Sequence, residues 1–150
     1  MNRPVFNKAE KQEDTFFIKM PSDLTHYVHL KDYHAEISYL YLIIVDFFNV
    51  KLGYAFPNID QIAVKYGKSK ETTRKHLAIL KKYELIGVID TEEKGHAYVP
   101  YVPLTSDEFY DKYTDAFNNY RDKLKRLHSD RVSARDRMKR FRDKQNDATV

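Results

Sequence analysis

The sequence predicts a mainly helical α+β fold with one small β-hairpin and a long C-terminal helix. Apolar residues recur at spacings of three and four along several segments, as they do on the buried faces of helices. Two β-rich runs, 85–90 and 96–102, flank a polar loop that ends in Gly95, which is typical of a hairpin. The stretch from Thr105 to about Lys144 contains no Gly or Pro and is predicted to form one continuous helix.

The chain is predicted to divide into three parts. Residues 1–15 form a polar, flexible arm that lacks the apolar stretch of a secretory signal. Residues 16–104 form one domain, because 150 residues with 42% apolar side chains suffice for one compact core and an extension. Residues 105–145 form the long helix. At the start of the domain, residues 16–20 are predicted to form a short strand that ends at Pro21.

The central helix of the domain is predicted from about Asp32 to Val50, after an ambiguous segment, 22–31. Its regularly spaced apolar positions are Ala35, Ile37, Leu40, Tyr41, Ile44, Val45 and Phe48. Further apolar side chains lie between them, so the helix is apolar on most sides, which is typical of the central helix in a small domain. A turn and a very short strand are predicted at 53–57.

Two shorter helices follow, and their ends are marked by capping residues. Asn58 suits the N-cap of a helix from Ile59 to Tyr66, and Gly67 ends it. Ser69 suits the N-cap of a second helix that runs to about Tyr83. The spacing of Thr73, Leu77 and Leu80 turns that side inward. The outward residues are then Lys70, Glu71, Arg74, Lys75 and Ala78, with Ser69 and Thr72 at the leading end.

The order of these elements is that of a winged helix-turn-helix, in which the second motif helix enters the DNA major groove and the hairpin lies beside the backbone. We therefore predict DNA contact by Ser69, Lys70, Glu71, Thr72, Arg74 and Lys75. From 65 to 82 the chain has seven Lys or Arg and one Glu. Lys94 at the wing tip is a further candidate, although two glutamates precede it. The alternatives are a solvated basic helix face and a wing that only packs on the domain.

Three segments, Tyr54–Ala63, Ser69–Leu77 and Leu85–Ile86, carry a resemblance to a known family. They resemble the winged helix-turn-helix of replication-initiation and primosome proteins of low-GC Gram-positive bacteria, and of related phage and plasmid regulators. The resemblance covers about residues 35–102 and implies the same fold and DNA as a partner. The chain departs from the family pattern by having Lys68 in place of an aliphatic residue, Thr73 in place of Val or Ile, and Glu84 in place of Gly.

The C-terminal helix carries a second periodicity. Residues at spacings of three and four form a seam like that of a coiled coil, and its apolar members are Phe117, Tyr120, Leu124, Leu127, Met138 and Phe141. Arg131 and Ala134 occupy the two seam positions between Leu127 and Met138, and they weaken the middle of the seam. This predicts a homodimer joined through the helix; the alternative is that 105–127 pack on their own domain and the rest is a solvated tail. Between 121 and 144 there are eleven Lys or Arg and four Asp. The basic half favours either DNA phosphates or an acidic protein partner.

Several classes of protein find no support in the composition. The chain has no cysteine, which excludes disulfides, thiolate metal sites and a cysteine nucleophile. Four glycines do not build a phosphate-binding loop, and His26, His29 and His34 lack the carboxylates of a metal site. The longest apolar run, 39–48, is too short to cross a membrane. We expect no enzyme, cofactor, metal or membrane contact, and a cytoplasmic, nucleoid-associated location.

The leading hypothesis from the sequence is a sequence-specific, double-stranded-DNA-binding protein, acting as a dimeric transcriptional regulator of phage or plasmid type. A net charge of +4 and a pI of about 9.1 are compatible with it. One alternative is an accessory factor of replication initiation or the primosome, which binds origin DNA with the same domain and a replication protein with the long helix. Another is an interaction adaptor that does not bind DNA.

Overall fold

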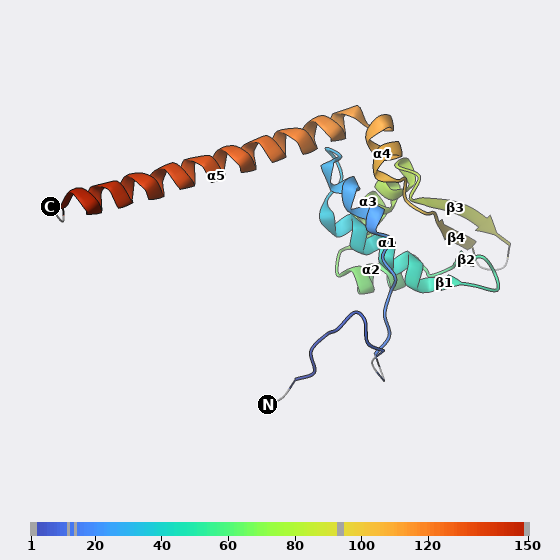
Figure 1. Ribbon diagram of the computed structural model, residues 1–150. Coiled ribbons are helices and arrows are strands. Elements are labelled where there is room, and N and C mark those ends of the chain that lie inside the picture. Colours follow the sequence, from blue (N-terminus) through green and yellow to red (C-terminus); the bar gives the residue numbers. More distant parts are fainter. Residues whose placement is uncertain (1–2, 12, 14, 93–94, 149–150) are drawn as a thin grey trace.

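The computed structural model describes residues 3–148 except 12, 14, 93 and 94. Helix α1, Ala35–Phe47, lies at the centre of the domain and packs against α2, Ile59–Tyr66, and α3, Lys70–Lys82. A small sheet lies at one side of these helices, and the long helix α5, Thr114–Ala148, projects away from them (Figure 1). The fold is therefore the α+β winged helix-turn-helix with a long C-terminal helix that the sequence predicts.

The centre of the core is α1, as predicted, but its ends differ from the expectation. Ile37, Leu40 and Ile44 are fully buried. The helix ends at Phe47 because Phe48–Asn49 forms strand β1, which pairs antiparallel with β2, Tyr54–Ala55. The ambiguous segment before it contains a 3-10 helix, η1, Ser22–His29.

The predicted strand at 16–20 is wrong. This segment is irregular and exposed, and 97% of Phe16 is accessible to solvent. A strand needs a second backbone to pair with. The strands of the sheet follow the order β1-β2-β4-β3, and residues 16–20 lie on neither edge. The apolar segment at 16–20 therefore has no neighbouring strand to pair with.

The predicted hairpin is confirmed and belongs to a four-stranded antiparallel sheet. Strand β3, Ile86–Thr91, pairs with β4, Gly95–Pro100, and Val88 lies opposite Tyr98. Strand β4 also pairs with β2, through Ala55 and Tyr98. The hairpin is thereby attached to the turn that leads into α2, so its position relative to the helix-turn-helix is set by backbone pairing.

Both predicted caps of the helix-turn-helix are present. Asn58 and Gln61 form a reciprocal capping box at the start of α2. Gly67 ends α2 with a φ of 72°, the left-handed conformation that glycine adopts without strain. Ser69 caps α3 by accepting a hydrogen bond from the Thr72 amide over 3.1 Å. These local bonds set the turn between the two helices.

The three departures from the family pattern are accommodated locally. The Lys68 ammonium lies 3.1 Å from the Glu36 carboxylate on α1. The Thr73 side chain is fully buried, and its hydroxyl donates to the Ser69 carbonyl over 2.8 Å. Glu84 takes up the left-handed conformation, with a φ of 58°, and its carboxylate lies 3.3 Å from the Lys112 ammonium. A glutamate therefore occupies the backbone position for which the family pattern has glycine.

The C-terminal helix is long, as predicted, but it is not continuous from Thr105. Helix α4, Ser106–Lys112, ends at Tyr113, whose φ of −114° and ψ of 77° are not helical. The Tyr113 ring contacts Tyr83 edge to face, with centroids 5.5 Å apart, and Phe109 is fully buried. Packing of α4 on the domain thus turns the chain before α5 begins.

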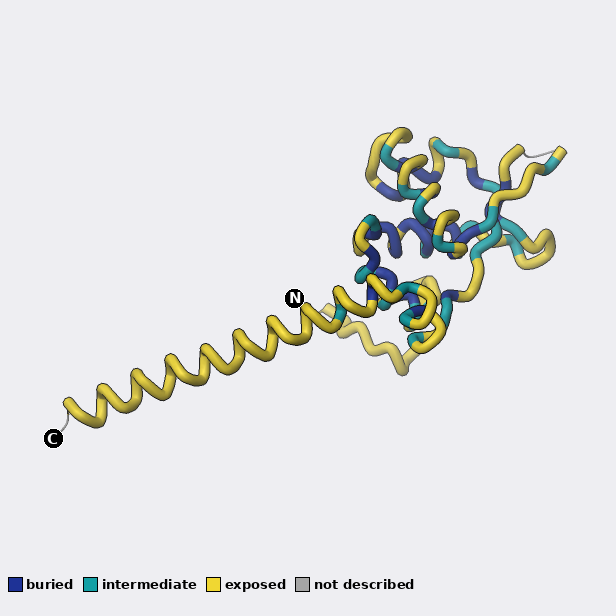
Figure 2. Tube along the Cα trace, turned by 90° about the horizontal axis from the view of Figure 1, so that it is seen from above, coloured by how far each residue is buried: buried dark blue, intermediate teal, exposed yellow. Residues whose placement is uncertain are grey.

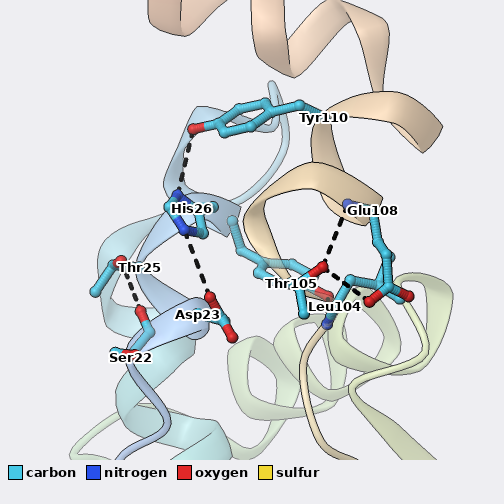
Figure 3. A network of polar contacts seen from close by, with 9 residues as sticks. Ser22, Asp23, Thr25, His26, Leu104, Thr105, Glu108 and Tyr110 are labelled. Atoms are coloured by element: carbon cyan, nitrogen blue, oxygen red, sulfur yellow. Dashed lines mark hydrogen bonds and ion pairs between the residues drawn. The ribbon is translucent and has the colours of Figure 1, made fainter.

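Contacts with η1 hold α4 and the start of α5 in place. The Tyr110 hydroxyl lies 3.4 Å from Nδ1 of His26, which belongs to η1 (Figure 3). At the start of α4, Thr105 caps the helix and its hydroxyl donates to the Glu108 carboxylate over 2.8 Å. The Asn119 amide donates to the His29 carbonyl over 3.1 Å. From Arg121 to the last described residue, every residue of α5 is exposed (Figure 2).

Candidate nucleic-acid interface

The inward and outward faces of α3 are those that the sequence predicts. Thr73 and Leu80 are fully buried, and Leu77 is 7% exposed. The predicted contact residues Ser69, Lys70, Glu71, Arg74 and Lys75 are exposed, and Thr72 is half-buried. The helix presents a polar edge to solvent.

Most of the positive charge near α3 is paired with acidic residues from other elements. Five of the seven cations between 65 and 82 lie within 4 Å of a carboxylate. The pairs are Lys65 with Asp46, Lys68 with Glu36, Lys70 with Asp60, Lys75 with Glu71, and Lys82 with Asp32. Arg74 and Lys81 are the two that form no ion pair with a described residue.

These two cations line one groove between α3 and the hairpin. The groove has a volume of about 600 Å³, and its other walls come from the β2–α2 turn, β3 and β4. Its apolar lining includes Phe56, Ile59, Leu77, Val88 and Tyr98. Arg74 and Lys81 are seven residues apart, which places them on the same face of the helix. The arrangement offers two uncompensated cations beside an apolar floor.

The Tyr98 phenol contributes a hydrogen-bond donor to this groove. Burial raises the pKa of Tyr98, and the nearby positive charge of Arg74 opposes that shift. The phenol is therefore protonated at neutral pH. It suits an acceptor oxygen placed between the helix and the hairpin.

The described part of the hairpin contains no lysine or arginine. Lys94, the predicted wing contact, lies outside the described residues. His96 lines the groove, but its Nδ1 lies 2.6 Å from the exposed Asp90 carboxylate. The described part of the hairpin thus offers an imidazole beside an acid.

His76 is turned away from the outward edge of α3. Its Nδ1 lies 2.8 Å from the Tyr66 hydroxyl, which joins α3 to α2. Burial lowers the pKa of His76 and raises that of Tyr66. The pair is neutral at physiological pH and stabilises the packing of the motif.

Lys81 is the contact candidate that the residue-by-residue prediction missed. Along α3, the residues that the sequence predicts to contact DNA end at Lys75. The seven-residue spacing from Arg74 to Lys81 was the available signal. The groove itself depends on strand pairing between β2 and β4, which the sequence does not reveal.

The predicted seam of α5 lies along one helix face. Five of its six residues are between 43% and 58% exposed, namely Phe117, Leu124, Leu127, Met138 and Phe141. The sixth, Tyr120, packs on its own domain, with its ring centroid 4.9 Å from that of His29. The first turns of α5 therefore contact the domain of their own chain, up to Lys123, whose ammonium lies 3.3 Å from Nδ1 of His29.

Within 3–148, apart from the four undescribed positions, no cluster of three or more His, Asp or Glu is arranged to hold a metal ion. No helix in the described part of the chain combines the length and apolarity needed to cross a bilayer.

Comparisons with known proteins give fold neighbours but no family. No family model matches the chain, and no curated protein matches it. A solved structure titled "N-Terminal domain of DNA binding protein" superposes with a TM-score of 0.52 and 15% identity, over 79% of this chain and 98% of that chain. Another, titled "Structure of Rep-DNA complex", gives 0.51 and 15%, over 75% and 95% respectively. At this identity the likeness establishes the fold alone.

Proposed function

We propose that the protein binds double-stranded DNA sequence-specifically, through α3 and the groove between α3 and the hairpin. One observation carries the proposal. Arg74 and Lys81 line that groove and form no ion pair with a described residue, whereas the other five cations of the motif are paired. Uncompensated cations on an exposed helix suit phosphate or guanine, and the major groove is wide enough to admit one helix.

The residues of α3 and its N-cap have distinct chemical parts in this proposal. The Arg74 guanidinium suits bidentate contact with guanine, and Lys81 suits a phosphate next to the hairpin. Ser69 and Thr72, at the N-terminus of α3, suit a second phosphate. The lysine ion pairs at the surface are no obstacle, because exposed salt bridges contribute only about 0–1 kcal/mol and a phosphate can replace the carboxylate. Glu71 supplies an acceptor for a cytosine amino group.

The biological role that we favour is transcription control by a dimer of phage or plasmid type, located with the nucleoid. The exposed seam of α5 supports the dimer, which places two copies of α3 on two half-sites. A second candidate is replication initiation, with a replication protein as a further partner. It is supported by the fold neighbour titled as a Rep-DNA complex, which matches over 75% of this chain.

Selection of bound duplexes from a random pool, followed by titration in increasing salt, tests the proposed function. We expect an enriched sequence and a steep loss of affinity as salt rises, because phosphate contacts release counterions. Enrichment of a palindrome supports the dimeric regulator, whereas repeated sites in an origin-like array favour replication initiation. Absence of any salt-dependent binding would overturn DNA recognition and favour the adaptor.

A further inference from the structure

The elbow between α4 and α5 contains an open hollow with an aromatic wall and an acidic rim. The hollow has a volume of about 770 Å³. Tyr110 stacks on Tyr120 with ring centroids 5.5 Å apart, and Phe117 meets Tyr110 edge to face at 5.7 Å. Asp107 and Asp111 belong to the rim, are exposed, and form no ion pair with a described residue. Such a hollow suits an apolar side chain flanked by cations.

The far end of α5 has that chemistry. Met138 and Phe141 are 55% and 58% exposed, and Arg137, Arg140 and Arg142 lie next to them in the helix. The segment from 121 to 144 contains eleven Lys or Arg and four Asp. None of its residues forms a salt bridge with a described residue. The chain thus carries a basic apolar surface and an acidic aromatic hollow at opposite ends of one straight helix.

A parallel pair of α5 helices is opposed by its own charges. In a parallel coiled coil each seam residue meets its counterpart, so Arg131 would face Arg131 of the second copy inside the interface. Arg137 would lie beside Arg142 of the second copy on the flank of the seam. The two basic halves would also run side by side. Like charges at these positions are destabilising, and a buried pair of them is severely so.

An antiparallel pair removes these conflicts in one particular register. When Leu124 lies opposite Leu127 of the second copy, Phe117 meets the small Ala134, as close packing requires. Arg131 then lies level with Tyr120 of the second copy instead of with a second Arg131. The flanking residues Lys123 and Asp130 also come together, and each of these pairings occurs twice because the arrangement is symmetric.

The same register brings the basic end of each helix to the elbow of the other. At about 1.5 Å per residue, Met138 of one copy is level with Tyr113 of the second, where α4 leaves α5. Phe141 lies one turn further along and reaches the hollow. Arg140 and Arg142 are then next to the rim carboxylates of Asp107 and Asp111.

We propose that two copies of the protein pair antiparallel through α5, with the basic end of each helix filling the acidic hollow of its partner. The inference rests on the dimer in the proposed function but not on the DNA contact. It assigns the hollow an occupant of defined chemistry, the segment 137–142 of a second copy. It also places the two α5 N-termini about 35 Å apart along the helix axis.

Spin labels on the full chain test the orientation, because the chain contains no cysteine that would compete with the label. Asp122→Cys and Asp143→Cys place labels at equivalent outward heptad positions, three heptads apart. In the proposed register the paired labels at 143 are separated by about 52 Å along the axis, and those at 122 by only about 10 Å. Similar short distances for both variants would establish a parallel pair and overturn the proposal. So would a monomeric mass in sedimentation without DNA.

Charge reversal tests the occupant of the hollow. We expect Arg140→Glu with Arg142→Glu to raise the dimer dissociation constant at least about tenfold, and addition of Asp107→Lys with Asp111→Lys to restore it. Arg126→Glu, an exposed reversal on the outward side of the same helix, serves as the matched control and should leave dimerisation within about twofold. Failure of the acidic-side changes to rescue the basic-side changes would overturn the pairing of helix end and hollow. If the wild-type protein is a dimer but does not bind DNA, only the proposed DNA contact is refuted.

Discussion

The backbone at Glu84 gives the sharpest test of local energetics in this fold. Glu84 is the only described non-glycine residue with a positive φ, 58°. An L-residue pays about 1–2 kcal/mol to adopt the left-handed conformation, and glycine does not. Glycine also lowers the free energy of unfolding by about 0.5–1 kcal/mol, because it gives the unfolded chain more conformational freedom. We therefore expect Glu84→Gly to be more stable than Glu84→Ala by about 0.5–1 kcal/mol.

The comparison with alanine isolates the backbone from the side chain. Both variants lose the Glu84–Lys112 ion pair, whose partners are 75% and 49% exposed and which is worth at most about 1 kcal/mol. Urea unfolding at neutral pH, with the two variants sharing the same m-value, measures the difference in the free energy of unfolding. If Glu84→Ala is as stable as Glu84→Gly, residue 84 carries no left-handed strain and this account of the α3–β3 turn is wrong.

Three further predictions concern the α2 cap, His29 and Lys81. Asn58→Ala should lower the free energy of unfolding by about 1 kcal/mol, because it removes the capping box of α2; urea unfolding measures it. Burial, and then the charge of Lys123, lower the pKa of His29 from 6.5. As the pH falls, His29 therefore takes up a proton in the unfolded chain before it does so in the folded protein. The free energy of unfolding should fall as pH drops below 6.5, and the fall should be shallower in His29→Gln. Lys81→Ala should weaken DNA binding equally for all sequences and reduce the slope of log affinity against log salt by about one in fluorescence anisotropy.

The parts of the fold that depend on neighbours in sequence could be predicted. Asn58, Gly67 and Ser69 end or begin helices through bonds within three or four residues, so the helix-turn-helix was predicted with its boundaries. The register of α3 was predicted because three buried positions on one helix determine which residues face outward.

The errors involve partners that are distant in sequence. The apolar run at 16–20 was assigned to a strand, but no strand of the sheet lies beside it. Helix propensity favoured a continuous helix through Tyr113, whereas contact of that ring with Tyr83, thirty residues earlier, accompanies the break. The excess of positive charge counted from 65 to 82 is likewise reduced by acids outside that range. Glu36 and Asp46 on α1 pair with Lys68 and Lys65, which precede α3.

Binding of Arg74 variants to the selected duplex tests the central claim most directly. Arg74→Ala, Arg74→Lys and the wild type are compared by fluorescence anisotropy, with Lys31→Ala, which removes an exposed cation from the η1–α1 turn, as the control. We expect Arg74→Ala to lose about 1–3 kcal/mol, or roughly 5- to 150-fold in affinity, and to relax specificity at one base pair. Arg74→Lys should retain the charge but not the discrimination, since only the guanidinium binds guanine bidentately. Equal affinity for the wild type and Arg74→Ala would contradict DNA recognition through α3.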